Sequence, residues 1–215
     1  MTIGHQIAEV MVLHQALSWR QAETRAVELI GAVGIPAPAA RARSFPHQLS
    51  GGQRQRAMIA MALACRPALL IADEPTTALD VTIQAQILDL ISDLQAGTGM
   101  AVQFISHNLA VISEIADEII VMYAGRIVER ATADALFAEP RHPYTRGLIA
   151  TLPDPARRTA RLPVIPGGVP RDDSGFAGCR FADRCPLADA GCRAAEPALA
   201  AVTPGHHVAC FKAGP

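Results

Sequence analysis

Ser50, Gly51 and Gly52, in the segment QLSGGQRQR, have the types and order that suit phosphate binding. Glycine lets a backbone approach a ligand closely, and the N–H groups at the start of a helix attract anions. We therefore expect a helix that begins at Gln53 and directs its free N–H groups at a phosphate, with the Ser50 hydroxyl as a donor. The segment alone is more often an ordinary glycine-rich helix start.

Asp73 and Glu74 form an acidic pair at the end of the apolar run LLIAD. Parallel strands present their carboxyl ends at the sheet edge where α/β proteins bind ligands. One carboxylate there can hold Mg²⁺ through water while the other takes a proton from an attacking water, as phosphoryl transfer requires. The alternative is an exposed turn after a strand, where acidic residues are common.

His107 follows a second apolar run, AVQFIS. At the same sheet edge its imidazole would be able to donate to a phosphate oxygen or to position the attacking water. A single histidine at the end of a strand is more often structural. The interpretation of His107 therefore depends on the glycines and the acidic pair.

The composition limits the functions that this chain can have. Its 215 residues suffice for one good core and a smaller appendage. The net charge is −1 and the only lysine is Lys212, so no nucleic-acid partner is predicted. The apolar runs are shorter than the roughly 18 to 20 residues of a membrane helix, and no signal-peptide pattern opens the sequence. We expect a cytosolic protein.

The elements that must position these residues follow an α/β pattern. Residues 1–40 have apolar positions at helical spacing, with Ser18 and Gln21 placed as a capping box. ALLIAD and AVQFIS are predicted to be buried parallel strands, joined by a helix whose apolar stripe includes Ile87. EIIVMYAGRIVER predicts a hairpin that turns at Ala124 and Gly125 and adds an antiparallel pair to the same sheet.

Composition and motifs divide the chain into four predicted segments. A helical subdomain that ends with the QLS of QLSGGQRQR is followed by an α/β core that contains the acidic pair and His107, a linker rich in proline and glycine, and a cysteine-rich extension. Their predicted bounds are 1–50, 51–152, 153–178 and 179–215.

Taken together, these motifs resemble the ATPase subunits of ABC transporters. The fold that this implies is a partial P-loop NTPase domain: a helical subdomain and a parallel-sheet core without its Walker A half. The resemblance assigns Leu49, Ser50, Gly51, Gly52 and Gln53 to the signature motif, Asp73 to the Mg²⁺-binding end of the Walker B strand, Glu74 to the catalytic glutamate, Ala78 to Asp80 to the D-loop, and His107 to the switch histidine.

A narrower resemblance concerns the transported substrate. The segments FPHQLSGG and PRHPYTRGLI, with the cysteine-bearing tail, are similar to those of the importers of oligopeptides and dipeptides and of their nickel-uptake relatives. This resemblance implies peptide import, with nickel or another small solute as the alternative.

The family's Walker A motif, Gly-x-x-x-x-Gly-Lys-Ser/Thr, does not occur in the sequence. In the family it precedes the Q-loop, and both precede residues like those at the start of this sequence. We expect either that the sequence starts at an internal methionine or that it is a truncated paralogue. A non-catalytic binding or regulatory module is the rival hypothesis. A DNA-repair ATPase with the same signature is disfavoured because no heptad run occurs.

The resemblance also implies partners. In the family two ATPase domains pack head to tail, so the signature would contact ATP and its Mg²⁺ held by the P-loop of a second ATPase subunit. The nucleotide site beside Asp73, Glu74 and His107 would be empty or weak. Two membrane permease subunits and an extracytoplasmic peptide-binding protein complete the expected assembly, which places the chain at the cytoplasmic face of the inner membrane, as a peripheral subunit.

Four of the five cysteines, Cys179, Cys185, Cys192 and Cys210, are spaced C-x5-C-x6-C-x17-C; Cys65 is expected to be a buried structural thiol. Disulfides are disfavoured in the cytosol, and the close C-x2–4-C pair typical of zinc sites is absent. Wider gaps suit a [4Fe–4S] cluster.

The resembling family carries such cysteines after its His-Pro-Tyr segment, here residues 142–144, with an iron–sulfur centre in some members. Zinc and free or oxidised thiols remain the alternatives. A cluster would be structural, since a segment this small cannot bury a core of its own.

Overall fold

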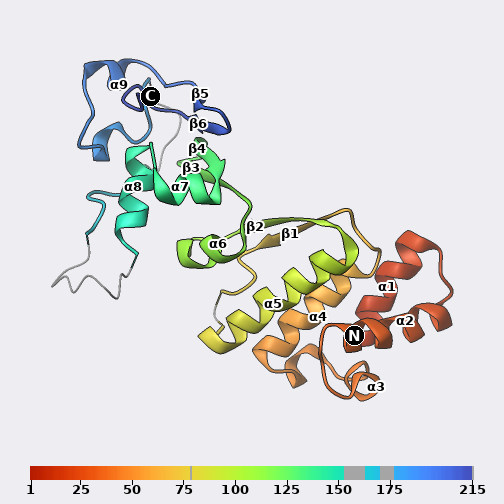
Figure 1. Ribbon diagram of the computed structural model, residues 1–215. Coiled ribbons are helices and arrows are strands. Elements are labelled where there is room, and N and C mark those ends of the chain that lie inside the picture. Colours follow the sequence, from red (N-terminus) through yellow and green to blue (C-terminus); the bar gives the residue numbers. More distant parts are fainter. Residues whose placement is uncertain (78, 153–162, 170–176, 215) are drawn as a thin grey trace. The chain divides into compact units, whose positions relative to one another are not determined.

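The chain divides into two compact units, Met1–His107 and Asn108–Pro215, in a computed structural model of the protein (Figure 1). Each unit has its own sheet and helices. The predicted division into four segments remains a prediction, and most of the predicted linker lies outside the described part of the chain. The structure describes residues 1–77, 79–152, 163–169 and 177–214.

The first unit starts with helices and continues as alternating strand and helix, which confirms the α/β class. Among the described residues, no helix is both long and apolar enough to span a bilayer. The elements of the unit are α1 (Ile3–Gln15), α2 (Trp19–Ala32), α3 (Pro38–Arg41), the 3₁₀ helix η1 (Pro46–Gln48), α4 (Gly51–Leu63), β1 (Leu69–Asp73), α5 (Val81–Thr98) and β2 (Ala101–Ile105).

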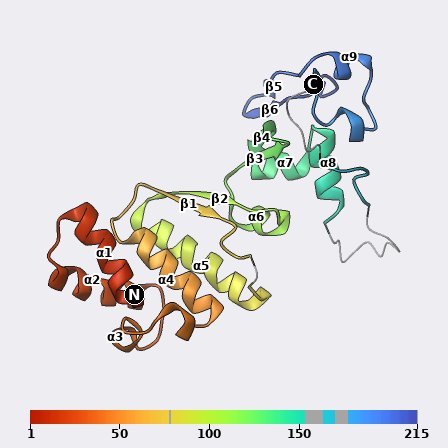
Figure 2. The ribbon, with the colours of Figure 1, turned by 180° about the vertical axis from the view of Figure 1, so that it is seen from behind.

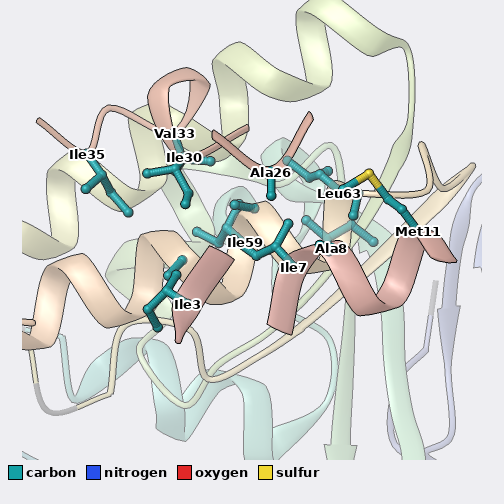
Figure 3. Close-up of a cluster of buried hydrophobic side chains, with 14 of the residues drawn as sticks. Ile3, Ile7, Ala8, Met11, Ala26, Ile30, Val33, Ile35, Ile59 and Leu63 are labelled. Atoms are coloured by element: carbon teal, nitrogen blue, oxygen red, sulfur yellow. The ribbon is translucent and has the colours of Figure 1, made fainter. Parts of the chain in front are cut away.

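The core of this unit is built from apolar residues at helical spacing (Figure 3). Ile7 and Met11 lie one turn apart on α1 and are 1% and 0% exposed. They belong to one apolar cluster with Ile30 of α2 and Ile59 of α4. Because β1 and β2 also contribute to this cluster, the helical region and the strands share one core.

The predicted capping box at the start of α2 is confirmed. The backbone N–H of Gln21 donates to Oγ of Ser18 at 3.4 Å, and the N–H of Ser18 donates to Oε1 of Gln21 at 3.1 Å. These two bonds satisfy donors that have no partner within the helix. The cap therefore fixes where the loop from α1 ends and α2 begins. Helices α1 and α2 lie side by side (Figures 1 and 2).

The two predicted parallel strands pair directly with each other. Their register runs from Leu69 opposite Ala101 to Asp73 opposite Ile105. The prediction that the strands are buried is correct for one face only: Leu70 is 7% exposed, whereas Ile71 is 59% exposed. The reason is that successive strand residues face opposite sides, and within this unit the helical core covers only the side of Leu70.

The second unit is an antiparallel sheet with short helices and a loop-rich end. Its four strands lie in the order β3-β4-β6-β5. The elements are α6 (Leu109–Ile115), β3 (Glu118–Tyr123), β4 (Arg126–Thr132), α7 (Ala133–Ala138), α8 (Pro143–Ala150), η2 (Ala182–Arg184), α9 (Ala190–Ala194), β5 (Ala200–Thr203) and β6 (His206–Val208).

The predicted hairpin is confirmed as β3 and β4. Ala124 and Gly125 have φ values of 45° and 78°, so both turn residues are left-handed, as a two-residue hairpin turn requires. The prediction that this pair extends the parallel sheet is wrong. The free edge of β4 is instead taken by β6, with Glu129 opposite Val208 and Arg130 opposite His207.

Substitution of Ile7 tests the helical core. Ile7→Ala should lower the free energy of unfolding of the first unit by about 2 to 5 kcal/mol, because it leaves a cavity among α1, α2 and α4. Leu13→Ala on the same helix is the control: Leu13 is 71% exposed, and its loss should change stability by less than about 0.5 kcal/mol. Urea unfolding followed by circular dichroism measures both, and equal effects would contradict this packing.

The packing of α4 against α5 leaves no room for a side chain at Gly52. A Cβ at Gly52 would lie 2.8 Å from Cγ2 of Ile83, whereas a Cβ at Gly51 would meet Leu79 Cδ2 at an ordinary 3.7 Å. Gly52→Ala should therefore destabilise the unit by about 1 to 3 kcal/mol, and Gly51→Ala should be close to neutral. In an Ile83→Ala background the penalty of Gly52→Ala should disappear; if it persists in urea unfolding, the clash is not its cause.

Candidate functional site

The signature segment forms the start of α4. The helix begins at Gly51, two residues before the predicted start at Gln53, because Ser50 and Gln53 form a capping box. The N–H of Gln53 donates to Ser50 Oγ at 3.3 Å, and the N–H of Ser50 donates to Gln53 Oε1 at 3.2 Å. Leu49, just before the cap, is buried.

Gly51 and Gly52 occupy the first two positions of α4, where backbone N–H groups have no partner within the helix. Gly51 is exposed and Gly52 is half-buried. Ser50 Oγ is used as an acceptor in the cap, so its hydrogen stays available for donation. This arrangement can receive an anion at the helix start.

Two arginines in QRQR hold the signature in place, a role that the sequence analysis missed. Nη1 of Arg54 donates to the carbonyl of Leu49 at 2.6 Å, and Nη1 of Arg56 donates to the carbonyl of Val33 at the end of α2 at 2.6 Å. A charged donor makes a stronger bond than a neutral one. Both arginines therefore secure backbone on either side of the capped helix start.

The acidic pair lies at the carboxyl end of β1, as predicted. Asp73 is the last strand residue and is exposed. The N–H of Glu74 donates to the carbonyl of Ile105 at 2.9 Å, so the pairing with β2 continues one residue beyond the strand. Glu74 has a φ of +46°, a left-handed conformation that costs energy in a residue with a side chain.

Glu74 and His107 meet at this edge. Nδ1 of His107 lies 2.9 Å from Oε1 of Glu74. The hydroxyl of Thr77 donates to the other oxygen, Oε2, at 2.8 Å. The bond from His107 first, and the bond from Thr77 second, hold the pKa of the Glu74 carboxyl below its usual range. The arrangement keeps an exposed carboxylate ionised, which a general base requires.

The tautomer of His107 follows from this contact. An ionised carboxylate only accepts hydrogen bonds, so Nδ1 of His107 must carry the proton that Glu74 receives. In the neutral ring Nε2 is then an acceptor. The predicted donation from the His107 ring to a phosphate therefore requires a protonated imidazolium, whereas neutral His107 can accept from a water.

Asp80 begins α5. Its Oδ1 accepts from the N–H of Ile83 at 2.9 Å, which makes it the N-cap of that helix. Ala78, which belongs to the predicted D-loop, lies outside the described residues. Ser50 and Asp80 make their hydrogen bonds within their own caps, so the structure joins Glu74 to His107 and Thr77 but not to the signature.

The four cysteines of the tail line one cavity in the second unit, together with His142 and Phe181 among others. All four are free thiols, and burial raises the pKa of Cys179 and Cys185. Among the residues that the structure describes, no three His, Cys, Asp or Glu side chains are grouped so that they could hold a metal ion.

Cys65 lies apart from the tail cysteines. The sequence predicts a buried thiol, but the residue is only half-buried, because it follows the last turn of α4. Its Sγ is 3.8 Å from the carbonyl of Val10 on α1. The contact supports the structural role that was predicted for this thiol.

A buried carboxylate that the sequence analysis missed anchors the His-Pro-Tyr segment. Glu129 of β4 is 0% exposed and accepts from the N–H groups of Arg141 and His142, at 2.6 and 3.0 Å. His206 Nε2 lies 2.7 Å from the same carboxylate. Burial lowers the pKa of His142 to about 4, so its ring is neutral, and its Nδ1 accepts from the N–H of Tyr144.

Comparison with known proteins agrees with these motifs. A family model described as "ABC transporter" matches residues 2–77, and one described as "Oligopeptide/dipeptide transporter, C-terminal region" matches residues 128–192. Together they include the signature segment, Asp73 and Glu74, the His-Pro-Tyr segment and three of the four tail cysteines.

Three relatives align with almost the whole chain. The Probable peptide ABC transporter ATP-binding protein y4tR of Sinorhizobium fredii is 55% identical over 98% of this chain and 63% of that protein. The Dipeptide transport ATP-binding protein DppD of Escherichia coli is 52% identical over 97% of this chain and 64% of that protein. The Oligopeptide transport ATP-binding protein AppD of Bacillus subtilis is 50% identical over 98% of this chain and 64% of that protein.

The chain thus spans a little under two thirds of the length of the curated relatives that it matches. The descriptions of both family models and the names of all three relatives agree with the family that the signature, the acidic pair and the strand-end histidine resemble. Over nearly its whole length the chain is similar to ATP-binding proteins of peptide ABC transporters.

Proposed function

We propose that the chain is an ATP-binding and ATP-hydrolysing subunit that powers the import of peptides by an ABC transporter. The observation that carries the proposal is the Glu74–His107 pair at the carboxyl edge of β1 and β2, 2.9 Å apart. A carboxylate held ionised beside an imidazole suits activation of a water for attack on a phosphate. The relatives' names supply the substrate class, di- or oligopeptides.

Each site residue has a proposed part in hydrolysis. Asp73, exposed after β1, would hold Mg²⁺, which neutralises charge on the phosphates. Glu74 would take a proton from the attacking water as the water oxygen bonds to the γ-phosphorus and the bond to the ADP oxygen breaks. His107 would keep Glu74 oriented and contact the water or the phosphate.

The signature would act on a nucleotide held by another chain. In the proposed arrangement Ser50, Gly51 and Gly52 contact ATP bound to the P-loop of a second ATPase subunit, with Leu49 and Gln53 holding the segment in shape. Support for this comes from the exposed, capped helix start. Residues 1–215 contain no P-loop of their own, so Asp73, Glu74 and His107 need one from residues outside this sequence.

The further assembly is proposed from the family. Two permease subunits and an extracytoplasmic peptide-binding protein would complete the importer, and the chain would lie at the cytoplasmic face of the inner membrane. Neither nickel nor another small solute is favoured by a feature of the structure. Substrate choice would reside in the binding protein and the permeases.

For the tail we propose an iron–sulfur cluster held by Cys179, Cys185, Cys192 and Cys210, with zinc as the second candidate. The support is that these four thiols line the same cavity. Binding would draw them together, since as they lie no three described His, Cys, Asp or Glu side chains are grouped to hold a metal ion. Four cysteine ligands are the usual set for a [4Fe–4S] cluster. The cluster would connect the C-terminal loops, which contain few regular elements.

Substitutions of the acidic pair test the proposed function. Glu74→Gln should retain ATP binding and abolish hydrolysis, because the amide has nearly the same shape but cannot accept a proton. Asp73→Asn should instead weaken Mg²⁺-dependent ATP binding. ATP binding, hydrolysis and uptake of a labelled dipeptide should be measured with a form of the chain that is extended N-terminally to carry its own P-loop, assembled with a second ATPase subunit and the permeases.

The same experiment contains its control. Asp93→Asn, on an exposed position of α5, removes one carboxylate from the same unit and should leave binding, hydrolysis and uptake unchanged. Equal loss of binding in the Glu74 and Asp73 variants would contradict the division of roles. Uptake of nickel but not of peptide would overturn the proposed substrate.

The tail is tested by its metal content. Protein purified without oxygen should be brown, absorb near about 400 nm and contain about four irons per chain. Changing any one of the four cysteines to serine should lower the iron content, whereas Cys65→Ser should not. A colourless anaerobic protein with stoichiometric zinc would decide for zinc, and one without metal would contradict both.

A further inference from the structure

Both oxygens of the Glu74 carboxylate are held by side chains. His107 contacts Oε1 at 2.9 Å, and the Thr77 hydroxyl donates to Oε2 at 2.8 Å. The first contact joins two strand ends, whereas the second lies within the four-residue turn that follows β1. Because each carboxylate oxygen has two lone pairs, an oxygen held in this way keeps one lone pair for a water.

The turn is built so that Thr77 points back at Glu74. The N–H of Thr77 donates to the carbonyl of Glu74 at 3.1 Å, which closes the turn. Thr76 is 8% exposed and its carbonyl accepts from the N–H of Leu79 at 3.3 Å, so the middle of the turn is anchored. The left-handed backbone at Glu74 starts this same turn.

We propose that Thr77 is a positioning residue for Glu74: its hydroxyl sets the rotation of the carboxylate, so that the free lone pairs face the attacking water. This inference rests on the proposed role of Glu74 as the base. His107 holds the other oxygen and cannot set the rotation alone, since one contact leaves the carboxylate free to turn about its last bond.

Thr77→Val tests the proposal, because valine keeps the branched shape and lacks the hydroxyl. In a form of the chain that is extended N-terminally to carry its own P-loop and assembled with a second ATPase subunit, it should lower kcat for ATP hydrolysis about tenfold and leave KM for ATP unchanged. Thr77→Ser should restore kcat. Thr24→Val, which removes an exposed hydroxyl that donates to the carbonyl of Arg20 on α2, is the matched control and should change neither kcat nor KM.

A second measurement does not depend on turnover. Crystal structures of the 215-residue chain should show the Glu74 carboxylate rotated in Thr77→Val, and in its original orientation in Thr77→Ser. An unchanged kcat in Thr77→Val, or a serine variant as impaired as the valine variant, would overturn the proposal. Hydrolysis that survives Glu74→Gln would instead show that Glu74 is not the base, whatever Thr77 does.

Discussion

The in-register pairing of β1 with β2 is the interaction on which the site depends. It continues through the bond from the N–H of Glu74 to Ile105, so the chain leaves both strands at the same edge. Glu74 and His107, 33 residues apart in sequence, meet only for this reason. A shift of one residue would turn every side chain of a strand to the opposite face and separate the two. The register in turn rests on the core, where Ile87 of the connecting helix is fully buried.

Structural and proposed functional roles coincide at the helix starts. Ser50 and Asp80 both act as N-caps, and Gly52 is required by Ile83 irrespective of any ligand. A helix start that is capped and packed holds its N–H groups rigidly before a ligand arrives, which favours binding by preorganisation. The same residue types can therefore satisfy folding and phosphate recognition without conflict.

The sequence was informative where periodicity and turn chemistry were strong. The capping box of Ser18, the two parallel strands and the hairpin at Ala124 were predicted, because each depends on neighbouring residues. The start of α4 was placed two residues late, since the capping box that begins at Ser50 was not recognised. The exposed side of Ile71, the pairing of β4 with β6 and the burial of Glu129 depend on contacts distant in sequence, and a single glutamate in a strand gives no sign of them.

The bond between Glu129 and His206 spans 77 residues. The strands and helices described for the first unit lie within residues 1–107, and its paired strands are joined by a single helix. The second unit has a longer loop to close, because β6 (His206–Val208) pairs with β4 and supplies the histidine that contacts the buried Glu129. Until β6 is in place, Glu129 lacks this partner and the edge of β4 is open, so the second sheet should be the slower of the two to form.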